Sequence, residues 1–108
     1  MKTYNKLVRD KIPQIIEASG KTCEVKILDD EAYEESLKAK LIEEMNEVQT
    51  AKSDEELIEE LADLYEVLCS LVARKGYSQE EFLDVVNSKN EKKGRFREKV
   101  FLLNVIEK

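Results

Sequence analysis

The sequence predicts an all-α protein, a helical bundle of four to five helices in a single domain over residues 1–108, with at most a small accessory β-ribbon. Only three glycines and one proline occur in 108 residues, too few turns for a many-stranded sheet. Apolar residues recur at intervals of three and four, and helix-capping signals separate these stretches. A single core of this size is marginally stable alone, so we expect a homodimer or a higher homo-oligomer.

The first expected helix is short and lies between Asp10, a candidate cap, and Gly20, a candidate stop. Pro13 suits its first turn, where a missing backbone N–H is harmless. Residues 22–28 alternate weakly between polar and apolar types and fit a short strand. The apolar tail 100–106 fits either a strand or a helix, and as a strand it would pair with the first.

The second expected helix has the clearest apolar stripe in the chain. Asp29 or Asp30 is its candidate cap, and it ends near Lys52. Residues spaced by three and four along it define one face. They are Tyr33, Leu37, Leu41, Met45 and Val48.

Two more helices follow, each opened by a capping box in which a serine precedes a glutamate by three residues. The third runs from Ser53 to Lys75, where Gly76 stops it. The fourth runs from Ser78 towards Gly94. The apolar arc of the third helix is about 220° wide, more than one neighbouring helix covers, which favours a partner chain.

Composition excludes several kinds of chemistry. The chain has no histidine, which removes zinc hydrolases and di-iron sites built on Glu-x-x-His. It has no glycine-rich phosphate loop, so it is not a P-loop ATPase. With 18 basic and 24 acidic residues its net charge is -6, which argues against a nucleic-acid polymer as partner.

The cellular compartment is also constrained. Cys23 and Cys69 are too few and too far apart for a disulfide framework or a thiol motif, and they fit ordinary thiols in a reducing environment. No stretch of about 18 apolar residues is present to span a bilayer, and the charged first residues do not resemble a signal peptide. We therefore expect a cytoplasmic protein without a membrane partner.

Carboxylates interrupt the apolar faces of the second and third helices. On a helical wheel at about 100° per residue, Glu44 falls inside the stripe and Glu47 about 60° to one side, one turn on. On the third helix Glu60 falls within the apolar face, and Asp63 repeats the same offset. Glu43 falls further round.

Four inward carboxylates call for neutralisation, because burying an ionised carboxylate costs several kcal/mol. A donor set without histidine or cysteine selects a hard cation, so we predict Mg²⁺, with Mn²⁺ as a substitute. The predicted metal ligands and catalytic residues are Glu44, Glu47, Glu60 and Asp63, any one of which is able to accept a proton. In the alternative interpretation these side chains reach solvent or pair with Lys40 and Arg74.

These residues resemble the EExxE and ExxD motifs of the MazG-like and phosphoribosyl-ATP pyrophosphohydrolase superfamily of all-α nucleoside triphosphate pyrophosphohydrolases. Glu43-Glu44-Met45-Asn46-Glu47 matches the first motif and Glu60-Leu61-Ala62-Asp63 the second. The opening Tyr4–Pro13 segment is similar to the start of a MazG-like subgroup. The resemblance implies Mg²⁺ held between the two motifs by the same four carboxylates.

Basic residues are candidates for binding phosphate. Lys89 and Lys93 continue the face of Phe82 and Val86 on the fourth helix, so we expect them to face inward. Lysine is a common partner of phosphate, although a basic helix end favoured by the helix dipole is the alternative. Arg9 and Lys11 are further candidates, unless they lie in a solvated turn.

The segment 89–96 resembles the superfamily's basic segment ending in Arg-Gly-Gly-Phe. It departs from that pattern because Lys93 stands where arginine is common and Arg95 where the second glycine is common.

The expected activity is therefore Mg²⁺-dependent hydrolysis of a nucleoside triphosphate to a monophosphate and pyrophosphate. Two alternatives stay open. In the first, the substrate is phosphoribosyl-ATP of histidine biosynthesis instead of a free nucleoside triphosphate. In the second, the chain is a non-catalytic helical dimerisation or regulatory module.

Overall fold

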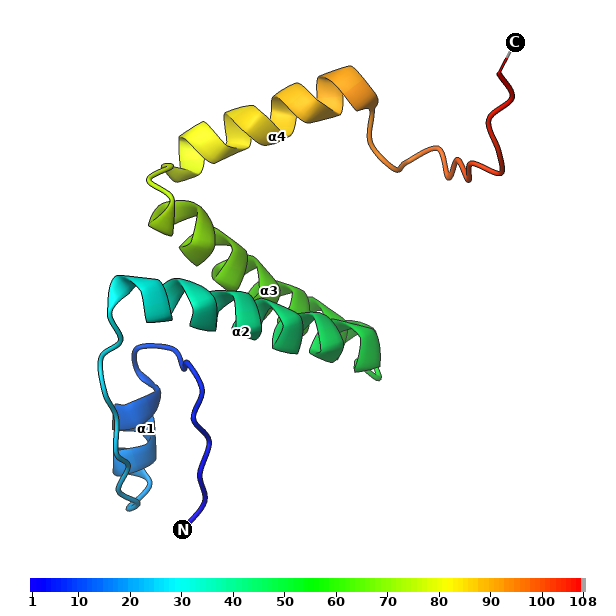
Figure 1. Cartoon of the computed structure of the whole chain (residues 1–108). Helices are drawn as coiled ribbons and strands as arrows, with labels where there is room; N and C mark the ends of the chain where they lie inside the picture. The colour runs from blue at the N-terminus through cyan, green and yellow to red at the C-terminus, as the bar shows by residue number, and fades with distance from the viewer. Residues whose placement is uncertain (108) are drawn as a thin grey trace.

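The computed structural model describes residues 1–107 and confirms the all-α class. Four helices follow one another along the chain: α1 (Ile12–Ala18), α2 (Asp30–Thr50), α3 (Asp54–Arg74) and α4 (Gln79–Lys93) (Figure 1). The number of helices and their order agree with the sequence prediction, and most boundaries lie within two residues of it.

The longer helices begin at the predicted side-chain caps. The carboxylate of Asp29 accepts a hydrogen bond from the backbone N–H of Ala32 at 2.8 Å, which satisfies one of the unpaired donors of the first turn. Ser78 forms a complete capping box with Glu81. Ser53 forms half a box, because the carboxylate three residues on accepts from the backbone of residue 52 instead.

The predicted cap of α1 is wrong. Lys11, not Asp10, occupies the N-cap position, and no side chain caps this helix. A lysine side chain only donates hydrogen bonds, so it cannot satisfy the N–H groups of the first turn. Pro13 lies in the first turn as predicted and lacks one of those donors.

α2 and α3 form an antiparallel hairpin joined by residues 51–53, and α4 diverges from this pair after packing on the end of α3 (Figure 1). The chain measures 66 × 35 × 25 Å, with a radius of gyration of 18.6 Å. A compact domain of this length has a radius of gyration of about 13 Å. The monomer is therefore elongated and leaves much of its helix surface uncovered.

The core lies between α2 and α3. Leu37 from α2 and Val67 from α3 are its buried apolar residues, and Glu44 is buried beside them with 8% of its surface exposed. Met45, predicted for the same stripe, is 45% exposed, because within residues 1–107 α3 is the one helix that packs against α2.

The expected β-ribbon is absent from the described residues 1–107, where neither 22–28 nor 100–106 forms a strand. These segments lie at opposite ends of the molecule because α4 carries the tail away from the N-terminal half (Figure 1). A strand requires a neighbouring backbone to bond to, and the two segments never meet.

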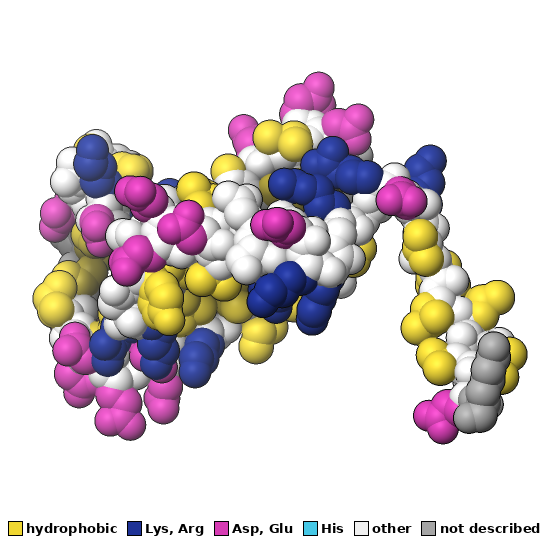
Figure 2. Space-filling model, turned by 90° about the horizontal axis from the view of Figure 1, so that it is seen from above, with side chains coloured by type: hydrophobic (Ala, Val, Ile, Leu, Met, Phe, Trp, Pro, Cys, Tyr) yellow, Lys and Arg dark blue, Asp and Glu magenta, His cyan; other side chains and the backbone are white. Residues whose placement is uncertain are grey.

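The tail 100–106 instead projects from the body with its apolar side chains exposed (Figure 2). Phe101 and Leu103, for example, are about 85% and 84% exposed. None of the helices in the described chain combines the length and apolar character needed to cross a membrane.

Candidate active site

Three of the four predicted carboxylates converge between α2 and α3. Carboxylate oxygens of Glu44, Glu60 and Asp63 all lie within 4.8 Å of one another. Glu44 comes from the inner face of α2, and the other two lie one turn apart on α3. We call this group the acidic cluster. Two antiparallel helices thus place three anionic groups around one small volume.

Glu47, the fourth predicted ligand, lies at the edge of the acidic cluster. It is exposed and is not part of the group of converging oxygens. It remains close enough for its charge to raise the pKa of both Glu44 and Glu60.

Basic side chains contact the acidic cluster and the neighbouring Glu43. Lys40 lies on α2 with its ammonium 3.8 Å from Glu44 and 3.4 Å from Glu43. The N-terminal segment adds a second contact, because the Arg9 guanidinium donates a 2.7 Å hydrogen bond to Asp63. The same segment also contacts Glu43, outside the acidic cluster, where the Lys6 ammonium lies 3.3 Å from the carboxylate.

Part of the alternative interpretation, in which the carboxylates pair with lysine and arginine, is therefore observed. Lys40 does pair with Glu44, but Arg74 pairs with Glu34 at the other end of α2, at 3.7 Å. Glu60 makes no ion pair within residues 1–107.

The electrostatics of the acidic cluster disfavour full ionisation. Burial is the largest effect on Glu44 and raises its pKa. The charge of Lys40 opposes this rise, and the charges of Asp63, Glu43 and Glu47 add to it, so that the pKa is raised on balance. Desolvation also raises the pKa of Glu60, helped by the charges of Glu47 and Asp63. Loss of water and like-charge repulsion both favour the neutral acid.

Glu43 behaves in the opposite way. Its partial burial raises its pKa, but the hydrogen bond from Lys6 and the charge of Lys40 together bring the pKa below its usual value. The two adjacent glutamates of α2 thus differ: the protein stabilises the ionised form of Glu43, whereas it destabilises the ionised form of Glu44.

The raised pKa of Glu44 predicts a pH-dependent stability difference. Ionised Glu44 destabilises the folded chain at neutral pH, and this penalty disappears as the pH falls through its folded-state pKa. Without divalent cations, we expect Glu44→Gln to melt at a higher temperature than wild type at pH 7.5. The gap should close towards pH 4.5, the ordinary value for glutamate.

The check is a series of melting curves in chelator from pH 4.5 to 8. Glu35→Gln is the matched control, because Glu35 lies exposed on the same helix. A Glu44→Gln protein that melts below wild type at pH 7.5 would mean that the Lys40 pair outweighs burial and repulsion.

The other predicted phosphate-binding residues lie away from the acidic cluster. Lys89 and Lys93 are exposed, contrary to the prediction that they face inward, because α4 leaves the body before it reaches them. Lys11 is exposed at the N-cap position of α1, and Arg95 is exposed just beyond α4. Of the predicted basic residues, Arg9 contacts the acidic cluster directly.

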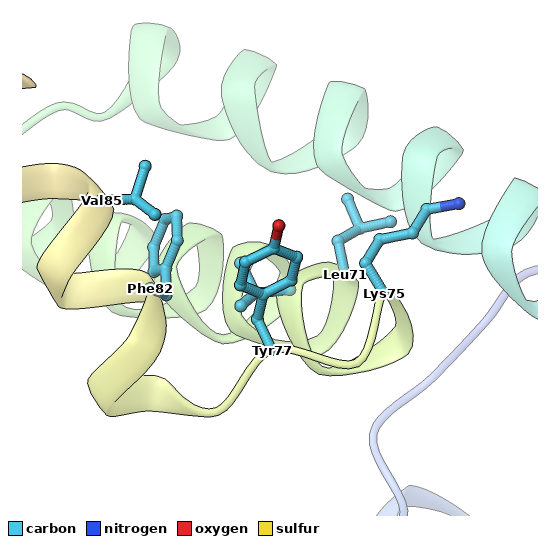
Figure 3. A pocket seen from close by; sticks show the side chains of 6 residues that line it. Leu71, Lys75, Tyr77, Phe82 and Val85 are labelled. Atoms are coloured by element: carbon cyan, nitrogen blue, oxygen red, sulfur yellow. The ribbon is translucent and has the colours of Figure 1, made fainter.

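A separate open groove of about 390 Å³ lies at the corner between α3 and α4 (Figure 3). Its lining is mostly apolar, and the Lys75 ammonium at its edge pairs with Glu34 at 2.8 Å. The groove begins two turns of α3 beyond Asp63. The lining residues are Leu71, Val72, Lys75, Tyr77, Phe82 and Val85.

One ion pair beside the acidic cluster was not predicted from the sequence. Lys6 and Glu43 form a pair that joins the N-terminal segment to α2. Glu43 lies outside the apolar stripe, and no local periodicity connects residue 6 with residue 43. The sequence feature that points to these contacts is the presence of two basic residues, Lys6 and Arg9, three positions apart in the N-terminal segment.

A family model described as phosphoribosyl-ATP pyrophosphohydrolase matches residues 3–90. The chain belongs to this family. The phosphoribosyl-ATP pyrophosphohydrolase family is part of the MazG-like all-α superfamily, so the resemblance drawn from the two acidic motifs is confirmed. Its members are hydrolases of phosphoric anhydride bonds. The match includes the acidic cluster, Arg9 and Lys89, and it ends before Lys93 and Arg95.

One relative of this phosphoribosyl-ATP pyrophosphohydrolase family member is an uncharacterized protein of Mycolicibacterium smegmatis, 43% identical over 53 residues. The alignment covers 49% of the chain and 54% of the relative, so the chain spans about half the length of the curated relative it matches. No solved structure matches the chain significantly.

Proposed function

We propose that the chain is a Mg²⁺-dependent pyrophosphohydrolase that cleaves a nucleoside triphosphate into a monophosphate and pyrophosphate, and that residues 1–108 act as one catalytic domain. The observation that supports this most is the convergence of three carboxylates from two helices, one of them buried in the core. Membership of a family of pyrophosphohydrolases supports the reaction type.

The residues of the acidic cluster fit a hard divalent cation. All of the converging donors are carboxylate oxygens, which Mg²⁺ and Mn²⁺ prefer. Glu44, Glu60 and Asp63 would hold the cation, with Glu47 nearby as a fourth donor. When bound, the cation supplies positive charge against the phosphates and lowers the pKa of an attacking water.

The side chains of this protein supply the remaining parts of the reaction. Lys40 and Arg9 bring positive charge to the acidic cluster, where it would attract the phosphates of a substrate. Any one of Glu44, Glu47, Glu60 and Asp63 would accept the proton that water releases on attack. Lys89, Lys93 and Lys11 remain candidates for binding phosphate.

A substrate panel tests this function. Nucleoside and deoxynucleoside triphosphates and phosphoribosyl-ATP are incubated with the protein and Mg²⁺, and pyrophosphate is measured. We expect release from at least one free triphosphate. Binding of Mg²⁺ without any pyrophosphate release would instead favour a non-catalytic regulatory module.

Phosphoribosyl-ATP is the second candidate substrate, and the description of the matching family favours it. This compound carries the same triphosphate linkage, so the acidic cluster alone does not distinguish the two substrates. The panel separates the two, because a clear preference for phosphoribosyl-ATP over free triphosphates would assign the chain to histidine biosynthesis.

We also propose that the protein works as a homodimer or a higher homo-oligomer. Ile58 and Tyr65 on α3 and Ile42 on α2 are more than half exposed, and the groove at the α3–α4 corner adds to this uncovered apolar surface. A second copy buries such a surface without requiring another protein. Light scattering coupled to size-exclusion chromatography tests this, and a monomer at micromolar concentration would contradict it.

A cytoplasmic location completes the proposal. Both cysteines are free thiols, and Cys23 is exposed. Exposed thiols persist in reducing compartments and oxidise elsewhere.

A further inference from the structure

The N-terminal segment holds two positive charges, on Lys6 and Arg9, against α2 and α3. We call residues 6–9 the basic loop. It follows Asn5, whose φ of +46° lies in the left-handed region that asparagine tolerates better than most residues. A cleft of about 110 Å³ separates the start of the basic loop from α2. Beneath α2 the chain turns and enters α1 (Figure 1).

Each end of the basic loop pairs with a carboxylate of a different helix. Lys6 pairs with Glu43 on α2, and Arg9 pairs with Asp63 on α3. The two contacts differ in kind, because Asp63 belongs to the acidic cluster and Glu43 does not. Arg9 therefore competes directly with anything else that would bind the same carboxylate.

The Arg9 pair is able to open. The Arg9 and Asp63 side chains are 55% and 44% exposed, so water replaces the contact readily when it breaks. The guanidinium makes a single hydrogen bond to Asp63 in this structure. A phosphate carries more negative charge than a carboxylate and accepts two parallel hydrogen bonds from a guanidinium, so it is able to compete for Arg9.

We infer that Arg9 is a countercharge that exchanges partners: it neutralises Asp63 while the acidic cluster is empty, and it moves to the phosphates of the substrate when a divalent cation takes over Asp63. This inference rests on the proposed function. It makes the 2.7 Å contact between Arg9 and Asp63 a feature of the resting site.

The exchange predicts effects of opposite sign on two ligands when Arg9 is replaced by glutamine. Mn²⁺ binding without nucleotide should become about two to five times tighter, because the competing ion pair is lost. Binding of inorganic pyrophosphate in saturating Mg²⁺ should become about tenfold weaker, because a charge-assisted contact is lost. Pyrophosphate serves as the probe because it carries no base.

The measurements are electron paramagnetic resonance of free Mn²⁺ and calorimetric titration with pyrophosphate. Lys2→Gln is the matched control, since it removes the same charge from the N-terminal segment at a side chain that lies over the Tyr4 ring, 5.2 Å from its centre. We expect neither affinity to change in this control. Raising the salt concentration should shrink the Mn²⁺ difference between Arg9→Gln and wild type, because the pair is exposed.

Three outcomes would overturn the exchange. Weaker Mn²⁺ binding by Arg9→Gln would mean that Arg9 only supports Asp63 as a ligand. Equal effects of Arg9→Gln and Lys2→Gln would mean that total charge alone matters. Tighter Mn²⁺ binding with unchanged pyrophosphate binding would mean that Arg9 never reaches phosphate. Failure of the proposed function is distinct, because the wild-type protein would then bind no Mn²⁺ or would release no pyrophosphate from any substrate.

Discussion

Replacing Glu60 with glutamine should lower pyrophosphate release at least about a hundredfold while leaving the cation-free protein folded. Glu60 is the member of the acidic cluster without an ion pair within residues 1–107, and its pKa is raised by desolvation and by Glu47 and Asp63. Glutamine nearly conserves its volume and relieves the repulsion. The same change removes a charged ligand, and even groups that only support a ligand are worth about 10- to 100-fold.

Glu59→Gln is the control for this experiment. Glu59 lies one residue earlier on α3 and is exposed, so neither turnover nor stability should change much. Activity is followed as pyrophosphate release at saturating Mg²⁺, and folding by circular dichroism. Near-wild-type turnover of Glu60→Gln, or a larger loss in Glu59→Gln, would show that the acidic cluster is not the reaction centre.

Divalent cations should raise the melting temperature of the wild-type protein by about 10 to 20 °C. A cation that binds only the folded state at one hundred times its dissociation constant adds about 2.7 kcal/mol. In a domain of about 100 residues, each kcal/mol raises the melting temperature by about 4 to 8 °C. The effect arises because the cation replaces repulsion around Glu44 and Glu60 with attraction.

Thermal unfolding with Mg²⁺, Mn²⁺ and chelator measures this effect. Chelator should reverse the rise, and Glu60→Gln should lose most of it because one ligand is missing. An unchanged melting temperature in the wild-type protein at millimolar Mg²⁺, with and without nucleotide, would contradict a metal site at this position.

Much of the fold was predictable because its determinants are local. The caps at Asp29, Ser53 and Ser78 depend on side chains within three residues of the helix start. The burial of Glu44 followed from helical periodicity, which places it among the apolar residues of α2. The same periodicity brought Glu60 and Asp63 to the face of α3 that meets it.

The rest depends on contacts between segments far apart in the sequence. The pairing of Arg9 with Asp63 joins residues 54 positions apart, which no periodic pattern specifies. The direction of α4 is likewise set by the corner after α3, so the expectation that Lys89 faces inward was wrong in the single chain. The β-ribbon failed for the same reason, because its two segments were carried to opposite ends.

The divergence of α4 makes that helix a lever. Its 15 residues span about 22 Å, and they follow the corner that contains Gly76, whose φ is +86°. Each degree of rotation there displaces the far end near Lys93 by about 0.4 Å, from the rise of 1.5 Å per residue. A tilt of about 20° therefore sweeps the basic end of α4 through about 8 Å, roughly the distance between the axes of two packed helices. Small changes in packing at the α3–α4 corner are thus amplified into large changes in the reach of Lys89 and Lys93.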